Sequence, residues 1–391
     1  MQNCKSNTKK IPELHTNAKI KYLARWSENA SIGVIKKIKN TTSALSENGY
    51  HAEHKIIEKG GVMGHLLLPL AILGCRADLL IIRSTAYSML LCSLPILIQR
   101  LMGAKIVIDV PTPLVSVLEE IKGSKKTKFE KIFLRTLVKL NYPLALYPAH
   151  RVIQYSEESA RFSFGLKRRM FFGANGIDVS SIDLREDKKN KQTNVITLIG
   201  VAALEEWHGY DRVIQGISNY YKNKKVITTQ ENDINFIIVG SGGAEPRLKA
   251  MAQDLEVSQH VSFKGTLNGQ ALTEAFNQAD VAVASLGLHR IGLYKASVLK
   301  SREYLARGFP ILVSTDDPDI PDTNDFVYRS KADDTAVDIE RLIEWHKTYV
   351  AIGCTAAIIR NFAAQHLDYK SKVSTYTEVL LTESSEVSSE N

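Results

Sequence analysis

The stretch ASVLKSREYLARGFPILVS, residues 296–314, decides the fold of this sequence because a helix start, a helix end and a strand follow one another in it. Ser297 can cap the helix by accepting a hydrogen bond from a first-turn N–H. Residues 299–306 carry apolar side chains at helical spacing, and Pro310 prevents continuation of the helix. The apolar run 311–313 is typical of a buried parallel strand. A helix that leads directly into such a strand is the repeating unit of an α/β fold.

Two polar residues of this helix are the first candidates for a functional site. Lys300 and Glu303 are three positions apart, so both side chains lie on one face of the helix. The free N–H groups and the dipole at the helix N-terminus favour an anion. The helix is therefore a candidate anion site with a carboxylate one turn away.

Length and composition indicate a globular protein of two domains. The chain has 391 residues, with 44% hydrophobic and 24% charged residues. Its net charge of +8 suits anionic partners such as nucleotide phosphates, nucleic acid or an acidic membrane surface. Four cysteines without a CxxC pair favour a reducing cytoplasmic setting and no metal site.

No secretory signal or spanning helix is expected. Residues 1–19 are polar, and the longest apolar runs, 65–75 and 86–98, are shorter than the roughly 18 residues that a spanning helix needs. Pro69 and Pro95 interrupt these runs. They are predicted to be buried core helices, and a peripheral membrane contact stays open.

Apolar runs alternate with helical segments along the chain, which predicts the α/β class with parallel sheets. A polar, charged segment at 185–194 has the composition of an interdomain linker. The expected strands are 20–25, 51–57, 79–83, 105–110, 151–155 and 170–172 before this linker, and 195–199, 235–239, 261–263, 281–284 and 311–313 after it.

The segment 122–141, KGSKKTKFEKIFLRTLVKLN, predicts a basic amphipathic helix. Phe129, Phe133 and Leu140 belong to its apolar face, and lysines and arginines dominate the remainder. Such a helix can lie on an anionic membrane, and a solvated domain face explains it equally well. Nucleic-acid binding is disfavoured, because the basic run has no interleaved aromatic residues.

Three strands of the second half end on glycine, at Gly200, at Gly240 and at Lys264-Gly265. Open parallel sheets bind ligands at the carboxyl ends of their strands. The loop GSGG that contains Gly240 and Gly242 is, by itself, more typical of a tight turn than of a dinucleotide site.

Basic residues gather at the same predicted edge. The segment WHGYDR, 207–212, contains His208 and Gly209, and GLHRIGLYK, 287–295, contains Arg290 and Lys295. Each loop by itself could be a structural turn or a solvated loop. Together with Lys300 they predict contacts to a diphosphate.

The order of these motifs resembles glycosyltransferase family 4. The resemblance implies the GT-B fold, in which two Rossmann-like parallel-sheet domains face each other across a cleft. It is carried by NGID at 175–178, WHGYDR, VGSGGAEPRL at 239–248, FKG at 263–265 and LKSREYLARGFPIL at 299–312, and more loosely by SIGV at 31–34 and the turn at 109–113. The expected domains are an N-terminal acceptor domain at 1–185, a C-terminal donor domain at 186–364, a helix at 365–382 that packs back on the first domain, and a tail at 383–391.

The resemblance also implies roles for single residues. Glu303 would hold the ribose hydroxyls, and His208 would contact the diphosphate where a lysine is commoner. The sequence departs from the family at Val201, where arginine is usual, and at Lys295, where a glutamate is usual. The expected catalytic residues are Asp109, Lys300 and Glu303. The expected donor-binding residues are Gly33, His208, Gly209, Gly240, Gly242, Lys264, Gly265, Arg290, Lys295, Ser297, Lys300 and Glu303.

The implied activity is transfer of a sugar from a nucleotide-diphosphate-sugar to a lipid-linked glycan in bacterial capsule, exopolysaccharide or lipopolysaccharide synthesis. Retention of configuration, no metal or cofactor, and a position at the cytoplasmic face of the membrane are expected. Asp109 is the acidic candidate to face the acceptor, and a turn-capping role explains it equally well. Two alternatives stay open: a non-catalytic GT-B partner of another transferase and, less favoured, a Rossmann oxidoreductase.

Overall fold

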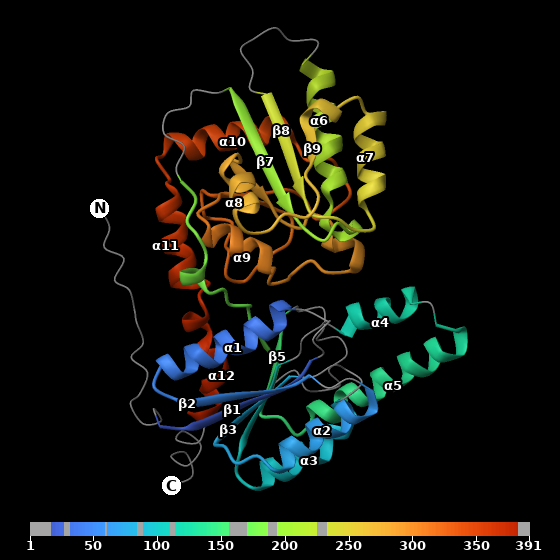
Figure 1. The fold of residues 1–391 in the computed structure, drawn as a ribbon, viewed down its shortest axis with the longest axis vertical. Coiled ribbons are helices and arrows are strands. Elements are labelled where there is room, and N and C mark those ends of the chain that lie inside the picture. The colour runs from blue at the N-terminus through green and yellow to red at the C-terminus, as the bar shows by residue number, and fades with distance from the viewer. Residues whose placement is uncertain are drawn as a thin grey trace, which may run out of the picture.

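The computed structural model describes residues 17–26, 32–58, 61–83, 89–109, 114–124, 126–155, 170–186, 194–224 and 233–381. Two six-stranded sheets, parallel throughout, form two domains that lie one above the other (Figure 1). Each sheet has helices on both faces. The predicted α/β class with two Rossmann-like domains is confirmed.

The first domain contains the sheet β2-β1-β3-β4-β5-β6. Its strands are continuous apolar runs because both faces are covered; all five residues of β3, for example, are buried. Its elements are β1 (Lys19–Arg25), α1 (Ile32–Glu47), β2 (His51–Ile57), α2 (Gly61–Leu73), β3 (Leu79–Arg83), α3 (Met89–Leu101), β4 (Lys105–Asp109), α4 (Leu114–Gly123), α5 (Lys128–Leu146), β5 (Arg151–Gln154) and β6 (Met170–Phe172).

The second domain contains the sheet β12-β11-β10-β7-β8-β9. Its elements are β7 (Val195–Val201), α6 (Tyr210–Lys224), β8 (Asp233–Val239), α7 (Glu245–Asp254), β9 (Val261–Phe263), α8 (Gly269–Asn277), β10 (Val281–Val283), α9 (Leu299–Ala306), β11 (Ile311–Val313), β12 (Val327–Arg329), α10 (Ile339–Ala351) and α11 (Ala356–His366). The sequence analysis missed β12, a short strand whose apolar run is only three residues long.

The chain crosses between the domains twice. Val179 is already buried in the core of the second domain, so the first crossing falls at 173–178, ahead of the boundary expected at 185. The second crossing follows α11. Tyr369, Val373 and Tyr376, in and before α12 (Val373–Thr377), are then buried against β1, β3 and β4 of the first domain (Figure 1).

The predicted burial of helices α2 and α3 is only half right. Ile72 and Ile96 lie in the core of the first domain. Leu70 and Leu94, on the opposite sides of the same helices, are 62% and 65% exposed. Among the described residues, no helix is both long and apolar enough to cross a membrane.

The loops that follow β7 and β8 pack tightly against each other. Leu204 N–H donates to the Ser241 carbonyl at 2.9 Å, and Ala202 N–H donates to the Val239 carbonyl at 2.9 Å. At Gly240 the backbone has a φ of +117°, and a Cβ would lie 1.7 Å from the Ala202 carbonyl oxygen. The glycine therefore serves the close approach of two loops at the edge of the sheet.

We expect Gly240→Ala to destabilise the protein by about 3 kcal/mol or more, because strain at positive φ adds to the collision with Ala202. Gly353→Ala is the matched control: its φ is +71°, and nothing lies within 4 Å of the added Cβ. The control should lose about 1 kcal/mol, measured by urea unfolding of both variants. Equal losses in the two variants would contradict the packing argument.

Candidate functional site

The second sheet has its topological switch point between β7 and β10, where the strand order reverses. The loops that follow these strands meet there: Leu286 N–H donates to the His208 carbonyl at 2.9 Å, and Gly287 N–H donates to the Trp207 carbonyl at 3.2 Å. Gly209 has a φ of +64°, and a Cβ there would lie 2.6 Å from Gly287 N. Ligands of open parallel sheets bind at such a switch point.

Lys300 reaches this point from the first turn of α9. Its Nζ lies 3.1 Å from His208 Nδ1 and 3.3 Å from Nε2. His208 Nδ1 also lies 3.0 Å from Ser285 Oγ, in the loop after β10. The structure thus brings together two of the predicted residues and adds Ser285, which the sequence analysis missed.

The environment weakens the charge of both basic groups. Burial, and then the nearby Lys300 charge, lowers the pKa of His208 to about 3, so the imidazole is neutral near pH 7. Burial lowers the pKa of Lys300 to about 7, although the Glu303 carboxylate favours the charged form. His208, which the sequence analysis counted among the basic residues, is therefore uncharged in this arrangement. An anion beside Lys300 would stabilise its ammonium form and draw a proton into the site.

Glu303 lies on α9, one turn after Lys300, with a side chain that is 40% exposed. Arg307 donates to its Oε1 from Nε at 3.2 Å and from Nη2 at 3.0 Å. Both hydrogen bonds from Arg307 go to the same oxygen, so Oε2 accepts neither of them. A carboxylate with a second acceptor oxygen can accept from a sugar hydroxyl.

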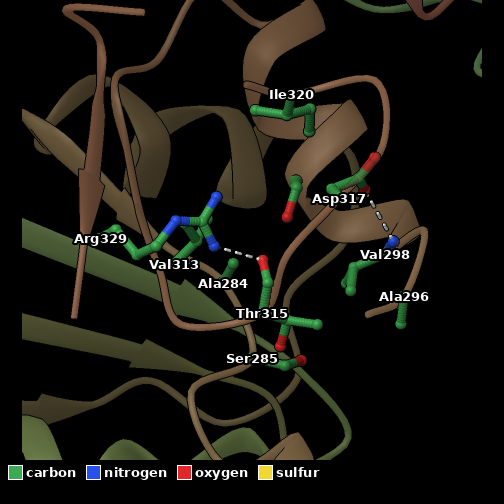
Figure 2. A pocket seen from close by; sticks show the side chains of 10 residues that line it. Ala284, Ser285, Ala296, Val298, Val313, Thr315, Asp317, Ile320 and Arg329 are labelled. Atoms are coloured by element: carbon green, nitrogen blue, oxygen red, sulfur yellow. Dashed lines mark hydrogen bonds between the residues drawn. The ribbon is translucent and has the colours of Figure 1, made fainter. Parts of the chain in front are cut away.

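The start of α9 differs from the prediction. The capping residue is Val298, and Ser297 makes no cap; its Oγ accepts from Asn175 N–H at 2.6 Å. The Asp317 carboxylate accepts from Val298 N–H at 3.3 Å instead (Figure 2). Behind this turn lies a cavity of about 10 Å³, lined by Ser285 and Asp317 among others, which has room for about one water.

Arg302 is a central residue that the sequence analysis missed. Its side chain is fully buried and donates from Nη2 to Asp317 Oδ1 at 2.9 Å and to Asp319 Oδ2 at 2.8 Å. Its Nε donates to the Asn175 carbonyl at 2.5 Å. The acidic run at 316–319 was the signal that could have found it, because a buried arginine needs carboxylate partners.

Arg290 is already occupied by carboxylates. It donates from Nη1 and Nη2 to Asp211 at 3.0 and 2.7 Å, and from Nε to Asp334 Oδ1 at 2.7 Å. Nη1 also donates to the Glu206 carbonyl at 2.7 Å. Arg290 therefore fixes the loop after β10 in place. Its guanidinium, which was predicted to contact a diphosphate, is paired with carboxylates instead.

The other predicted donor-binding residues either pack loops together or lie away from the His208–Lys300 contact. Gly242, like Gly240, packs its loop on the loop after β7. Gly265 accepts from Gly240 N–H at 2.7 Å, and the preceding Lys264 lines a cavity of about 250 Å³ with Asn235 and His260, separate from the His208–Lys300 contact. Gly33 is the second residue of α1, and residues 27–31 before it lie outside the described residues.

Lys295 lies at the interface of the two domains. It lines a cavity of about 250 Å³ with Tyr155 and Phe172 of the first domain and Asp316 of the second. The cavity adjoins the start of α9 through Ala296. This cavity lies between the two domains, where there is room for a second substrate.

Asp109 has a different surrounding from the one expected of an exposed base. Its carboxylate is fully buried, 3.0 Å from Arg83 Nη1 and 3.3 Å from Lys37 Nζ. It accepts hydrogen bonds from Tyr22 and, at 2.7 Å, from Tyr155. Burial alone would raise the pKa of Asp109, but the two cations and the two hydroxyls hold it well below its usual range.

Such a carboxylate is a poor proton acceptor, so the expected catalytic role of Asp109 is corrected to a structural one. The residues 110–113 that follow it lie outside the described residues. Among the described residues, no group of three or more histidine, cysteine, aspartate or glutamate side chains is placed to hold a metal ion.

Two facing parallel-sheet domains, with a basic contact at the switch point of the second, form the architecture known as the GT-B fold. Residues 181–345, which make up most of the second domain, match the family model described as Glycosyl transferases group 1. This match agrees with the glycosyltransferase class that the resemblance predicted. The match spans less than half of the chain and does not distinguish family 4.

Solved structures share the fold of the whole chain. The lipopolysaccharide outer core galactosyltransferase WaaB in its apo form is 12% identical, with 93% of this chain and 99% of that chain covered and a TM-score of 0.57. An alpha-glucosyltransferase in complex with UDP and a 13-mer DNA is 10% identical, with 94% and 100% covered and a TM-score of 0.57. Sucrose-phosphate synthase from Thermosynechococcus elongatus is 13% identical, with 95% and 98% covered and a TM-score of 0.54. A search of curated protein sequences gave no match.

Replacement of Asp109 tests its structural role. We expect Asp109→Asn to destabilise the protein by about 3–5 kcal/mol, because Lys37 and Arg83 would then be buried without their counter-ion. Since the pKa of Asp109 is depressed in the folded state, its contribution is present above the ordinary pKa of an aspartate and is lost as the pH falls through the lower value. Urea unfolding near pH 7 measures the loss.

Glu53→Gln is the control, because it removes an exposed partner of Lys21 in the same sheet and should leave the unfolding free energy nearly unchanged. If Asp109→Asn kept the full stability and lost sugar transfer, Asp109 would be catalytic after all.

Proposed function

We propose that this protein transfers a sugar from a nucleotide-diphosphate-sugar to a glycan acceptor. The carrying observation is the contact of Lys300 with His208 at the switch point of a group 1 glycosyltransferase domain, with Glu303 one turn further along α9. Basic groups at a switch point are suited to a diphosphate, and the half-exposed carboxylate of Glu303 is suited to the ribose diol.

In this proposal Lys300 stabilises the negative charge of the leaving group. As the bond between the anomeric carbon and the phosphate oxygen breaks, the nucleoside diphosphate leaves with the electron pair and its negative charge grows. The ammonium of the half-buried Lys300 stabilises that charge. His208 would turn an imidazole N–H toward the phosphate and Ser285 would keep the ring in place.

The acceptor side is proposed to lie in the cavity between the domains. Phe172 and Tyr155 offer aromatic surface to a sugar ring, and Asp316 offers a carboxylate to its hydroxyls. An acceptor hydroxyl that enters here would lie next to the start of α9. As the new glycosidic bond forms, the acceptor hydroxyl passes its proton to the diphosphate oxygen that leaves with the electron pair, so the products are the glycoside and the nucleoside diphosphate.

The finer features of the function follow from the resemblance and are proposals. We infer retention of configuration, transfer without a metal, and a lipid-linked glycan of the capsule, exopolysaccharide or lipopolysaccharide type as acceptor. The likeness to a lipopolysaccharide galactosyltransferase supports this choice of acceptor. The basic segment 122–141 would hold the protein at the inner face of the cell membrane.

A non-catalytic GT-B partner protein is the second candidate. The occupied guanidinium of Arg290 and the departures at Val201 and Lys295 favour it, because they remove or displace groups that the resemblance places at the donor. This candidate predicts binding of a nucleoside diphosphate without sugar transfer.

The central test is a donor screen, with UDP-sugars first because a similar structure contains UDP. We expect the protein to release nucleoside diphosphate in the presence of a glycan acceptor. Lys300→Met should lower kcat by roughly 100-fold or more, since a charge that acts mainly in the transition state is lost. Glu303→Gln should weaken donor binding with little change in Tm.

Lys249→Met, on exposed α7, is the matched control and should keep full activity. Diphosphate binding without turnover for any donor and acceptor would support the non-catalytic candidate. Absence of both binding and turnover would overturn the proposed function.

Donor binding should depend on pH through Lys300. Its pKa is about 7 without ligand and rises beside a diphosphate, so binding takes up a proton above pH 7. Affinity is expected to be constant below about pH 7 and to fall by up to tenfold per pH unit above it. Calorimetric titration of nucleoside diphosphates across this range measures the effect. Lys300→Arg keeps its charge and should lose this dependence; identical profiles for the two proteins would contradict the assignment.

A further inference from the structure

Helix α2 has apolar side chains on two opposite sides. Leu68 and Ile72 are fully buried in the core of the first domain. Leu66, Leu70 and Leu73, at spacings of four and three, are 46%, 62% and 42% exposed. The exposed stripe is therefore a second apolar face of the same helix, directed away from the sheet.

Helix α3 repeats this arrangement. Cys92 and Ile96 are fully buried, whereas Leu94 and Leu101 are 65% and 79% exposed. The solvent-facing side of both helices is therefore apolar and carries no polar stripe. A surface helix of a soluble domain normally carries such a stripe.

Helix α5 has the same two faces. Val138 and Leu146 are buried, while Phe129, Phe133 and Leu140 are 80%, 58% and 62% exposed. The apolar face that the sequence predicted at 122–141 is thus turned outward, and the core contact comes from other residues of the helix.

The three exposed stripes lie on one side of the molecule. α3 packs between α2 and α5, and all three contribute to the core on the same face of the first sheet (Figure 1). Their outward sides therefore point the same way. We call the exposed apolar side chains of α2, α3 and α5 the outer apolar face. Most exposed large apolar side chains of the described residues belong to it.

The charge of these helices is nearly all positive. Lys128, Lys131, Arg135 and Lys139 lie on α5 and Arg100 on α3, against a single acidic residue, Glu130. On α5 the basic residues flank the apolar stripe along the helix. Apolar side chains with a basic border complement a surface that is anionic outside and apolar within, which is an anionic lipid bilayer.

We propose that the outer apolar face inserts into the headgroup layer of an anionic membrane, with α2, α3 and α5 lying in the plane of the interface. This goes beyond the peripheral contact through segment 122–141: two further helices take part, and apolar insertion adds to charge attraction. It does not depend on sugar transfer. A protein with this surface would work on substrates held at the membrane.

Binding to lipid vesicles tests the proposal without nucleotide or acceptor. We expect the full chain to float with phosphatidylcholine vesicles that contain phosphatidylglycerol, and to bind pure phosphatidylcholine more weakly. The triple variant Leu70→Gln/Leu94→Gln/Phe133→Gln should lose roughly 1,000-fold or more in partition coefficient, since each inserted apolar side chain contributes about tenfold or more. Its Tm and its nucleoside diphosphate affinity should stay unchanged.

The matched control is Val350→Gln/Ile352→Gln/Ile358→Gln, three exposed apolar residues of the second domain, at 58%, 52% and 53% exposure. It should bind vesicles like the unchanged protein. Lys128→Gln/Lys139→Gln should reduce binding only to the vesicles with phosphatidylglycerol, by about fivefold per residue.

Three results would overturn the proposal. The unchanged protein could fail to bind either vesicle, or the triple variant on the outer apolar face could bind as well as its control. Size-exclusion chromatography with light scattering could also show a dimer that the triple variant dissociates, without vesicle binding. The outer apolar face would then be an interface between copies of the chain.

Discussion

The buried guanidinium of Arg302 is the constraint on which the site depends. It ties α9 to Asp317 and Asp319 in the loop after β11, and through the Asn175 carbonyl to the segment where the chain crosses between domains. An arginine at this depth keeps its charge only because carboxylates surround it, so the contact fixes all of these segments at once. Helix α9, which carries Lys300 and Glu303, is therefore held both to the loop after β11 and to the segment where the chain crosses between the domains.

The site held in this way has little unpaired positive charge. Lys300 and His208 face each other with weakened basicity, and Arg290 is paired with Asp211 and Asp334. Such a site does not have to be positively charged before the ligand binds. When a diphosphate arrives, its negative charge favours the ammonium form, and Lys300 takes up a proton. The departures at Val201 and Lys295 from the family pattern are consistent with a site that relies on one lysine.

The first domain contributes two different surfaces. Toward the second domain, Tyr155 links the buried Asp109 to the cavity that Lys295 also lines, so a charged cluster supports the wall of the proposed acceptor site. On the opposite side of its sheet, α2, α3 and α5 present the outer apolar face. A domain that holds an acceptor on one side and a membrane on another suits a lipid-linked substrate, because the acceptor would then reach the cleft from the bilayer.

The sequence by itself determined the alternation of strands and helices, the two-domain α/β class and the helix–strand unit of α9 and β11, because apolar periodicity and the positions of glycine and proline are local properties. It also singled out His208, Lys300 and Glu303. Only the tertiary structure decided which charges are free, since ion pairs join residues far apart in the chain: Arg290 with Asp334, Arg302 with Asp317, and Asp109 with Lys37 and Arg83. It also decided that one apolar side of α2, α3 and α5 faces outward, because periodicity shows that a face is apolar but not what lies against it.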